Sequence, residues 1–374
     1  MTESDLGKVD RDFFDEYVYP NLGADREDVS LGPQHGVDFG VVDLGKRAIA
    51  LASDPVFLMP SLGFERAAWF AFHVLVSDVA VSGLAPTHLA VDFNLPPEIT
   101  NAEFETVWET FDREAREVGV SIVTGHTGRY AGCNYPVVGG GTALALGARE
   151  EIVSPAGARP GDRVLVTKGP AIEATGLLSI QFESLMREDL PEEAVERATD
   201  RFYDMSPVHD ALTAAAAGPV TAMHDATECG VVGGLYEMAR AGAMRFEVET
   251  DPMPVAPGVE RACDFFGIDP WISISEGTLL LTVRPEGVED VLDALEGEGI
   301  PAAEVGEAVE GSGLAVDGRE RNHPERDPFW GTFEEFIGRL QARSVDEEDG
   351  SRDENGSGGT GAERDGETGA GDGR

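Results

Sequence analysis

Three aspartates in the first half of the chain stand in short segments whose residue types suit a metal–phosphate ligand. Asp38, Asp54 and Asp78 lie in GVDFGVV, ASDPVF and LVSDVAVSGLAP. Mg²⁺ in proteins is held by a few carboxylates together with waters and phosphate oxygens, so a magnesium ion shared by these aspartates is one hypothesis. Read singly, Asp54 at the carboxyl end of a strand can cap a turn, and a buried arginine or backbone donors can satisfy Asp78.

A second candidate is the segment Gly125-His126-Thr127-Gly128, which directly follows the strand-like run SIVT. Flanking glycines allow backbone N–H groups to approach a phosphate, and Thr127 adds a hydroxyl. His126 can position a phosphate, transfer a proton or hydrogen-bond locally. We therefore predict a phosphate-binding turn at Gly125 and Thr127, with His126 as a candidate catalytic group.

A third candidate is HDATECG, which lies between a strand-like TAM and a helix expected to start at Gly230. Backbone donors and the dipole at a helix N-terminus suit an anionic ligand, so Thr227 and Gly230 are candidate phosphate contacts. Asp225 is a candidate catalytic carboxylate that can coordinate the ligand's metal, although Asp225 or Thr227 can also be an ordinary N-cap. We expect Cys229 to be a packing residue.

The hydrophobic pattern places these segments in two domains, after a helical lead-in at residues 1–30. An N-terminal domain is expected over residues 31–153, with β-α-β-α-β-β order. Its second helix should start with a capping box of Thr100 and Glu103 and end at Gly119. The other elements expected are strands at 48–52, 120–124 and 137–146 and a buried helix at 65–82.

The pattern restarts near Ser154, which predicts a C-terminal domain over residues 154–342. The fold class is α/β (α+β), because strands and helices alternate there. Strands are expected at 220–223, 245–248, 277–283 and 303–309, and helices from 171 and at 231–241, 258–266, 288–297 and 329–340. We expect residues 343–374, rich in Gly, Asp, Glu and Ser, to form a disordered acidic tail.

The charge excludes some classes of function. The formal net charge is −42, and the acid is spread over every segment. Nucleic-acid binding is therefore not expected. With only three lysines and with arginine supplying nearly all other positive charge, the composition favours a halophilic protein whose self-repulsion is screened by salt. A protein that seeks a cationic partner is the alternative.

Other features predict a cytoplasmic protein. Its three cysteines, Cys133, Cys229 and Cys263, include no CxxC and no close pair, so neither a disulfide framework nor a zinc ribbon is expected. The N-terminus lacks the basic and apolar regions of a signal peptide, and no run reaches the roughly 20 apolar residues of a membrane span.

The order of these segments resembles the AIR synthase-related superfamily, which includes AIR synthase, selenophosphate synthetase, thiamine-monophosphate kinase and a hydrogenase-maturation dehydratase. The resemblance rests on GVDFGVV, ASDPVF, LVSDVAVSGLAP, TGHTG, HDATECGVVGGLYEMA and ISEGTLLLTV, over residues 30–310. With FFGIDPWISISEG, the pattern looks most like the archaeal group called hydrogenase-maturation-factor-like.

The resemblance implies a homodimer that binds ATP and Mg²⁺, with residues 31–153 as the ATP-binding and dimerisation domain and Asp38, Asp54 and Asp78 as magnesium–phosphate residues. It implies an enzyme that activates an unidentified small substrate by phosphorylation. A thiamine-phosphate-kinase-like phosphotransferase and a catalytically silent nucleotide-binding scaffold are the alternatives. Val37 and His126 stand where the kinase branch has acids, and the printed sequence does not end in the dehydratase's Pro-Arg-Ile-Cys.

Overall fold

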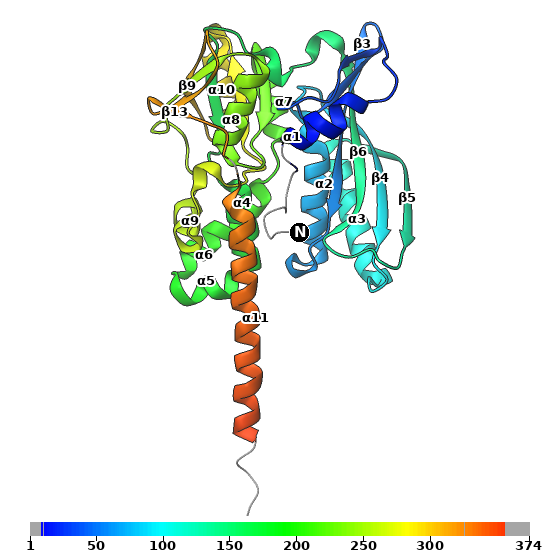
Figure 1. Cartoon of the computed structure of the whole chain (residues 1–374), viewed down its shortest axis with the longest axis vertical. Coiled ribbons are helices and arrows are strands. Elements are labelled where there is room, and N and C mark those ends of the chain that lie inside the picture. Colours follow the sequence, from blue (N-terminus) through cyan, green and yellow to red (C-terminus); the bar gives the residue numbers. More distant parts are fainter. Residues whose placement is uncertain (1–8, 10, 325, 356–374) are drawn as a thin grey trace, which may run out of the picture. The chain divides into compact units, whose positions relative to one another are not determined.

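The computed structural model describes all residues except 1–8, 10, 325 and 356–374. The chain divides into two units, residues 1–332 and 333–374. The first unit contains both sheets of the protein (Figure 1). No helix of the described part is both long enough and apolar enough to cross a membrane.

The first sheet has six strands in the order β1-β2-β3-β6-β4-β5, and only β4 and β5 pair in parallel. Along β3, Ala48, Ala50 and Ala52 are buried and alternate with more exposed residues, as a strand with one covered face requires. The strands are β1 (Val29–Leu31), β2 (Gly40–Asp43), β3 (Arg47–Phe57), β4 (Pro86–Leu95), β5 (Ser121–Arg129) and β6 (Val137–Ala148).

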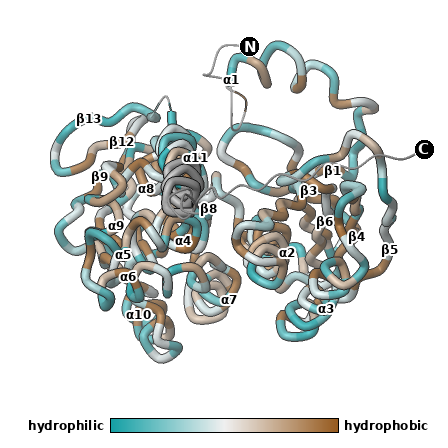
Figure 2. Tube along the Cα trace, turned by 90° about the horizontal axis from the view of Figure 1, so that it is seen from below, coloured by the Kyte–Doolittle hydropathy of each residue, from teal (hydrophilic) through white to brown (hydrophobic). Residues whose placement is uncertain are grey.

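Helices α2 (Phe64–Ala80) and α3 (Asn101–Val118) cover one face of this sheet (Figure 2). Apolar residues lie on nearly every face of α2 because it also packs against α7 and β8 of the second half. The predicted capping box of α3 is confirmed: Thr100 Oγ1 accepts from Glu103 N, and Thr100 N donates to Glu103 Oε2. Gly119 ends α3 with a φ of 87°, a left-handed conformation that favours glycine.

The second sheet has seven strands in the order β13-β12-β9-β11-β7-β10-β8, all antiparallel except the β12–β9 pair. Its interior strands β7 and β10 are buried along almost their whole length, which explains the apolar runs VLV and LLL that they contain. The strands are β7 (Arg163–Thr167), β8 (Val220–Asp225), β9 (Arg245–Val248), β10 (Leu279–Val283), β11 (Ala302–Val309), β12 (Gly313–Val316) and β13 (Arg319–Arg321).

Helices cover both faces of the second sheet. Helix α8 (Gly230–Ala241) packs on one face with Val166, Leu280 and Phe246. Helices α7 (Val208–Ala217) and α10 (Val288–Gly297) pack on the other face, where their apolar residues join those of α2 in one core. A separate helical group contains α4 (Ile172–Gln181), α5 (Glu183–Asp189), α6 (Glu192–Thr199) and α9 (Val259–Phe266).

The two ends of the chain differ in part from the prediction. Short helical turns occupy residues 11–21, including α1 (Arg11–Phe13), within the predicted lead-in. Helix α11 (Pro328–Asn355) starts close to the predicted residue 329 but continues past 340. Residues 343–355, assigned to the disordered tail, are therefore helical, and the rest of that tail lies outside the described residues.

Two local predictions in the first sheet are wrong. The segment at Gly125–Gly128 is not a turn, because β5 continues through it and pairs in parallel with β4, Gly125 beside Val91. Asp54 is not at the end of its strand either, since β3 continues to Phe57 with Asp54 paired to Gly141. Pairing with a neighbouring strand extended both strands beyond the apolar runs that predicted them.

The change from the first sheet to the second falls between the end of β6 at Ala148 and the start of β7 at Arg163. The predicted domain boundary at residues 153 and 154 lies in this interval. It stays a prediction, because α2 and α7 share one buried core across it. Helices α5, α6 and α7, which the sequence pattern did not predict, fill residues 183–217 between α4 and β8.

Candidate functional site

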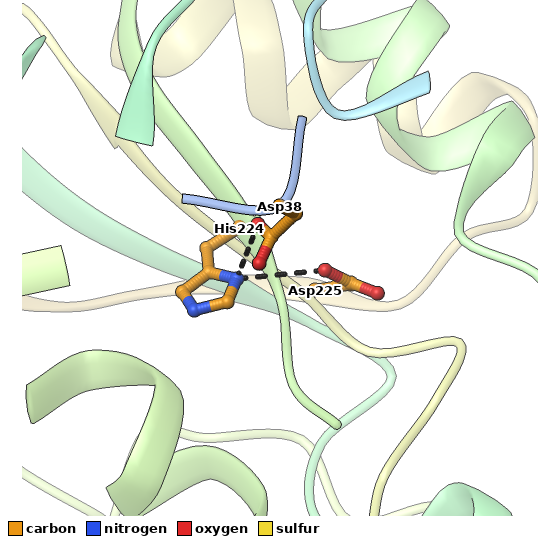
Figure 3. A group of neighbouring side chains, drawn as sticks. All are labelled: Asp38, His224 and Asp225. Atoms are coloured by element: carbon orange, nitrogen blue, oxygen red, sulfur yellow. Dashed lines mark ion pairs between the residues drawn. The ribbon is translucent and has the colours of Figure 1, made fainter. Parts of the chain in front are cut away.

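Asp38, His224 and Asp225 form a close group in which the two halves of the first unit meet (Figure 3). Asp38 Oδ2 lies 2.8 Å from His224 Nδ1, and Asp225 Oδ1 lies 3.4 Å from the same nitrogen. His224 and Asp225 are the last two residues of β8, whereas Asp38 precedes β2 of the first sheet. One ligand atom from each of these three residues can bind the same metal ion.

Asp54, Asp78 and Glu276 lie close enough to this group to interact with it electrostatically. Burial, followed by the charges of Asp54, Asp225, Asp38 and Glu276, raises the pKa of Asp78 well above its ordinary value. Burial, followed by the charges of Asp225 and Glu173, also raises the pKa of Glu276 well above its ordinary value. The five carboxylates, which we call the carboxylate cluster, are those of Asp38, Asp54, Asp78, Asp225 and Glu276.

Strand pairing brings Glu276 to Asp225. Strand β8 pairs antiparallel with β10 so that Asp225 lies opposite Leu279, the first residue of β10. Glu276 lies in the loop just before that strand, and Gly277 follows it with a φ of 99°. A side chain at Gly277 would meet the carbonyl oxygen of Asp204 at 2.2 Å, so only glycine allows this close approach.

The cluster lacks the donors that buried carboxylates require. Asp225 is completely buried and Glu276 is 3% exposed. Apart from the 3.4 Å ion pair of Asp225 Oδ1 with His224 Nδ1, no donor among the described residues satisfies the oxygens of Asp225 or Oε1 of Glu276. Buried carboxylates without partners cost several kcal/mol, and a bound divalent cation removes that cost. Oxygen ligands in this number are those that Mg²⁺ takes in proteins.

His224 links the two halves of the site. Burial alone would lower its pKa, but Asp38, Asp225 and Glu237 together raise the pKa of His224 well above its ordinary value. Its Nε2 lies 3.0 Å from Glu237 Oε2, and His323 Nε2 lies 3.5 Å from the other oxygen of Glu237. The imidazole therefore fixes the orientation of Asp38 and Asp225 relative to each other.

A buried ion pair holds the loop that carries Glu276. Lys168 Nζ lies 3.0 Å from Asp210 Oδ1 and donates to the carbonyl oxygens of Asp204, Ser206 and Gly277. Thr167 Oγ1 donates to the other oxygen of Asp210. Lys168 thus connects the β7 end, α7 and the loop before β10 through one ammonium group.

A groove on the first sheet contains part of the predicted phosphate segment. Its volume is about 550 Å³, and its walls include Asp54, Asp92, Gly125, His126 and Thr142. Gly125 is required there, because a Cβ would meet the carbonyl oxygen of Val91 at 2.0 Å. His126 Nε2 lies 2.6 Å from the hydroxyl of Tyr130. Asp54 is the residue that this groove shares with the carboxylate cluster.

Helix α8 starts at Gly230 as predicted, but its cap differs from the one that the sequence suggested. Its N-cap is Cys229, with a φ of 63°, and neither Asp225 nor Thr227 caps it through a side chain. Instead, Asp327 Oδ2 accepts a hydrogen bond of 2.7 Å from Cys229 N. Asp225 cannot cap the helix, because it completes β8 and is buried in the carboxylate cluster.

The comparisons with known proteins decide the family. The model of the AIR synthase related protein, N-terminal domain, matches residues 36–147, and that of the C-terminal domain matches residues 159–319. The chain belongs to the AIR synthase-related family. Both sheets of this AIR synthase-related protein lie almost wholly within the matched ranges.

Curated relatives are hydrogenase-maturation proteins. The carbamoyl dehydratase HypE of Azotobacter vinelandii is 31% identical over 251 residues, which cover 64% of this chain and 68% of that one. A Methanocaldococcus jannaschii protein named for hydrogenase expression/formation is 22% identical over 77% of this chain and 84% of its own. The predicted likeness to the hydrogenase-maturation-factor group is therefore confirmed.

Solved structures confirm the predicted two-domain fold. HypE of E. coli has a TM-score of 0.63 at 27% identity, covering 80% of this chain and 93% of that one. A HypE structure in complex with ATP has a TM-score of 0.59 at 24% identity, and the match covers 85% of this chain and 93% of that one. AaThiL complexed with AMPPCP and TMP has a TM-score of 0.63 at 21% identity, covering 78% and 90%. At these identities the last two show the fold alone.

The predicted site residues of this AIR synthase-related protein lie at three places. The carboxylate cluster contains Asp38, Asp54, Asp78 and Asp225, which come from separate segments. His126 and Gly125 lie on the groove, on the strand that also carries Thr127. The half-buried Thr227 accepts a hydrogen bond from Gly230 N through its carbonyl oxygen at the start of α8. The roles predicted for these residues stay predictions.

Sequence reasoning missed Glu276 and His224 as site residues. Both stand in segments that carry the family resemblance, ISEGTLLLTV and HDATECG. A usable signal was present for Glu276: a carboxylate and a glycine directly precede an apolar strand. Lys168 and Asp210 had no such signal, because their pairing depends on packing between β7 and α7.

Glu173 gives this AIR synthase-related protein a predicted pH dependence. Burial raises the pKa of Glu173 to about 8, opposed by a hydrogen bond from Glu276 N and supported by Asp327 and Glu228. Because the folded-state pKa exceeds the unfolded value of 4.5, the folded protein binds an extra proton between these pH values. The free energy of unfolding should therefore fall as the pH rises from 4.5 to about 8. Above that pH, Glu173 should cause no further fall.

Glu173→Gln should remove this part of the pH dependence, since the amide oxygen can still accept from Glu276 N. In magnesium-free buffer, we expect the variant to unfold at a higher temperature than the parent at pH 9 and at an equal temperature at pH 4. Glu117→Gln, on the exposed face of α3, is the control and should unfold at the same temperature as the parent at both pH values. Equal midpoints for parent and Glu173→Gln at pH 9 would contradict the prediction.

Proposed function

We propose that this protein binds ATP with Mg²⁺ at the carboxylate cluster and uses it to phosphorylate an oxygen of a small substrate. The observation that carries the proposal is the convergence of five carboxylates from five separated segments, two of them buried without sufficient donors. Such a group repels itself unless cations are bound. Magnesium would offset the charge of the phosphates and help to place the transferred phosphoryl group.

The chain's own residues have distinct parts in this proposal. Asp38, Asp54 and Asp78 belong to the N-terminal half and would hold the metal from one side. Asp225 and Glu276 belong to the C-terminal half and would hold it from the other. The groove with Gly125 and His126 would hold the nucleotide next to Asp54.

The comparisons support this proposal. Relatives are named carbamoyl dehydratase HypE, one HypE was solved with ATP, and AaThiL was solved with AMPPCP and TMP. The two solved structures share the fold of this chain. We therefore propose a hydrogenase-maturation-factor-like ATP-dependent activity, with the substrate left open.

The test is ATP binding and ADP production by the purified full chain in molar potassium chloride. We expect calorimetry to detect ATP binding that requires Mg²⁺ and is lost in Asp54→Asn, together with slow ADP release. Binding without any ADP release would favour the nucleotide-binding scaffold, and phosphate transfer to added thiamine monophosphate would favour the kinase alternative. No magnesium-dependent binding at all would refute the proposed site.

We also propose that the protein is a homodimer. Helices cover one face of the first sheet, whereas Ile49, Leu51, Leu144 and Leu146 alternate onto its other face and are only half-buried. Apolar side chains on an uncovered sheet face favour pairing with a second copy.

Light scattering in molar salt should therefore give twice the chain mass of 39.8 kDa. Leu144→Glu should yield a folded monomer, because a buried unpaired charge opposes association. Val255→Glu changes an apolar residue that is 41% exposed elsewhere, and it should leave the dimer intact. A monomeric parent at every protein concentration would exclude this assembly.

A further inference from the structure

A second cavity lies where the linker between the two sheets passes over β8. Its volume is about 310 Å³. The linker contributes Ile152, Val153 and Ser154, and the start of β8 contributes Val220 and Thr221. Gly157 brings these walls together, because a Cβ there would meet the carbonyl oxygen of Thr221 at 2.0 Å. The remaining walls are formed by Pro219 and two arginines.

The two arginines, Arg159 and Arg284, are the charged residues of this cavity. Neither side chain forms an ion pair or hydrogen bond with another residue that the structure describes. Other arginines of the chain are paired, as Arg163 is with Glu304 and Glu307. Arg159 is exposed and Arg284 is half-buried, so a ligand can reach both side chains from solvent.

The nearby carboxylate of Asp162 does not pair with either guanidinium group. Asp162 is buried, and its Oδ2 accepts hydrogen bonds from Arg159 N and from Thr221 Oγ1. No carboxylate of a described residue lies within ion-pairing distance of either guanidinium. The planar donors of Arg159 and Arg284 are therefore available to an oxyanion, which they bind in a bidentate manner.

We propose that this cavity is a binding site for a small organic oxyanion, a carboxylate or phosphate monoester with a short apolar body. The guanidinium groups of Arg159 and Arg284 would hold the oxyanion, and Ile152, Val153 and Val220 would contact the apolar body. Asp225 lies four positions after Thr221 in β8, about 13 Å along the strand, so this ligand does not touch the carboxylate cluster. The site is therefore distinct from the proposed ATP site.

Phenyl phosphate is a suitable probe because it combines an oxyanion with an apolar ring. Calorimetry on the full chain would use constant potassium chloride and EDTA, so that the metal-free carboxylate cluster repels the probe. We expect phenyl phosphate to bind more tightly than inorganic phosphate, and benzyl alcohol, the matched neutral molecule, not to bind. Arg159→Gln and Arg284→Gln should each weaken binding about tenfold, the loss of one charge-assisted contact.

Arg261→Gln is the matched control, since this exposed arginine of α9 lies outside the cavity and has no ion pair among the described residues. It should bind phenyl phosphate as the parent does. Both cavity variants should keep the parent's thermal midpoint, because neither guanidinium has an intramolecular partner to lose. Binding that is equal in all variants, or lost equally in Arg261→Gln, would overturn the proposal. So would a parent that does not bind phenyl phosphate.

Discussion

Asp225→Asn is expected to abolish the stabilisation that Mg²⁺ and ATP give the parent while leaving the metal-free protein at least as stable. Asp225 is completely buried, its one described cationic partner is His224 at 3.4 Å, and it raises the pKa values of Asp78 and Glu276. Removing its charge relieves repulsion in the absence of metal. Removing a ligand lowers the affinity for the metal–nucleotide complex, and the ligand-induced shift falls with it.

Thermal unfolding with and without Mg²⁺ and ATP measures this. At a ligand concentration of about 100 times Kd, the parent should gain about 2.7 kcal/mol. Asp78→Asn should behave like Asp225→Asn if Asp78 is also a ligand. If Asp78 only accepts structural hydrogen bonds, its variant should be destabilised in both conditions with the shift unchanged.

Asp162→Asn is the control for this experiment, because Asp162 is equally buried but accepts hydrogen bonds away from the cluster. It should be destabilised equally with and without ligand and should keep the full shift. If Asp225→Asn and Asp78→Asn also kept the full shift, the carboxylate cluster would not be the metal site.

Lys168→Met is expected to destabilise the fold by about 3–5 kcal/mol, because it leaves the Asp210 carboxylate buried without its partner. The Asp210 side chain is 1% exposed and that of Lys168 is 13% exposed. The substitution also removes the donor to the carbonyl oxygens of Asp204, Ser206 and Gly277. Chemical denaturation of parent and variant measures the change in the free energy of unfolding.

Two further variants test whether the buried charge is the cause. Lys168→Met combined with Asp210→Asn should be more stable than Lys168→Met alone, since the unpaired charge is gone. Arg187→Met removes surface pairs with Glu183 and Glu192, in which the Arg187 side chain is 42% exposed, and should cost about 1 kcal/mol or less. A Lys168→Met variant as stable as Arg187→Met would show that the pair does not support the loop before β10.

The sequence pattern predicted those elements whose evidence is local. The capping box of α3, strand β9 at Arg245–Val248 and helix α10 at Val288–Gly297 agree with the predicted ranges. Their limits follow from turn residues and from apolar periodicity within one segment. The lengths of β3 and β5 could not be predicted in the same way, because pairing with β6 and β4 extends them through polar residues.

The residues of the candidate site also fall into two groups, those that the local sequence indicated and those that only the tertiary structure revealed. Residue types alone indicated that Asp38, Asp54, Asp78 and Asp225 suit a metal–phosphate ligand, and the order of their segments indicated the family. Only the tertiary structure decided that Glu276 joins them and that Asp327 lies at the start of α8. The physical reason is that these contacts join segments distant in sequence, which strand pairing and core packing bring together, and neither leaves a periodic signal within a single segment.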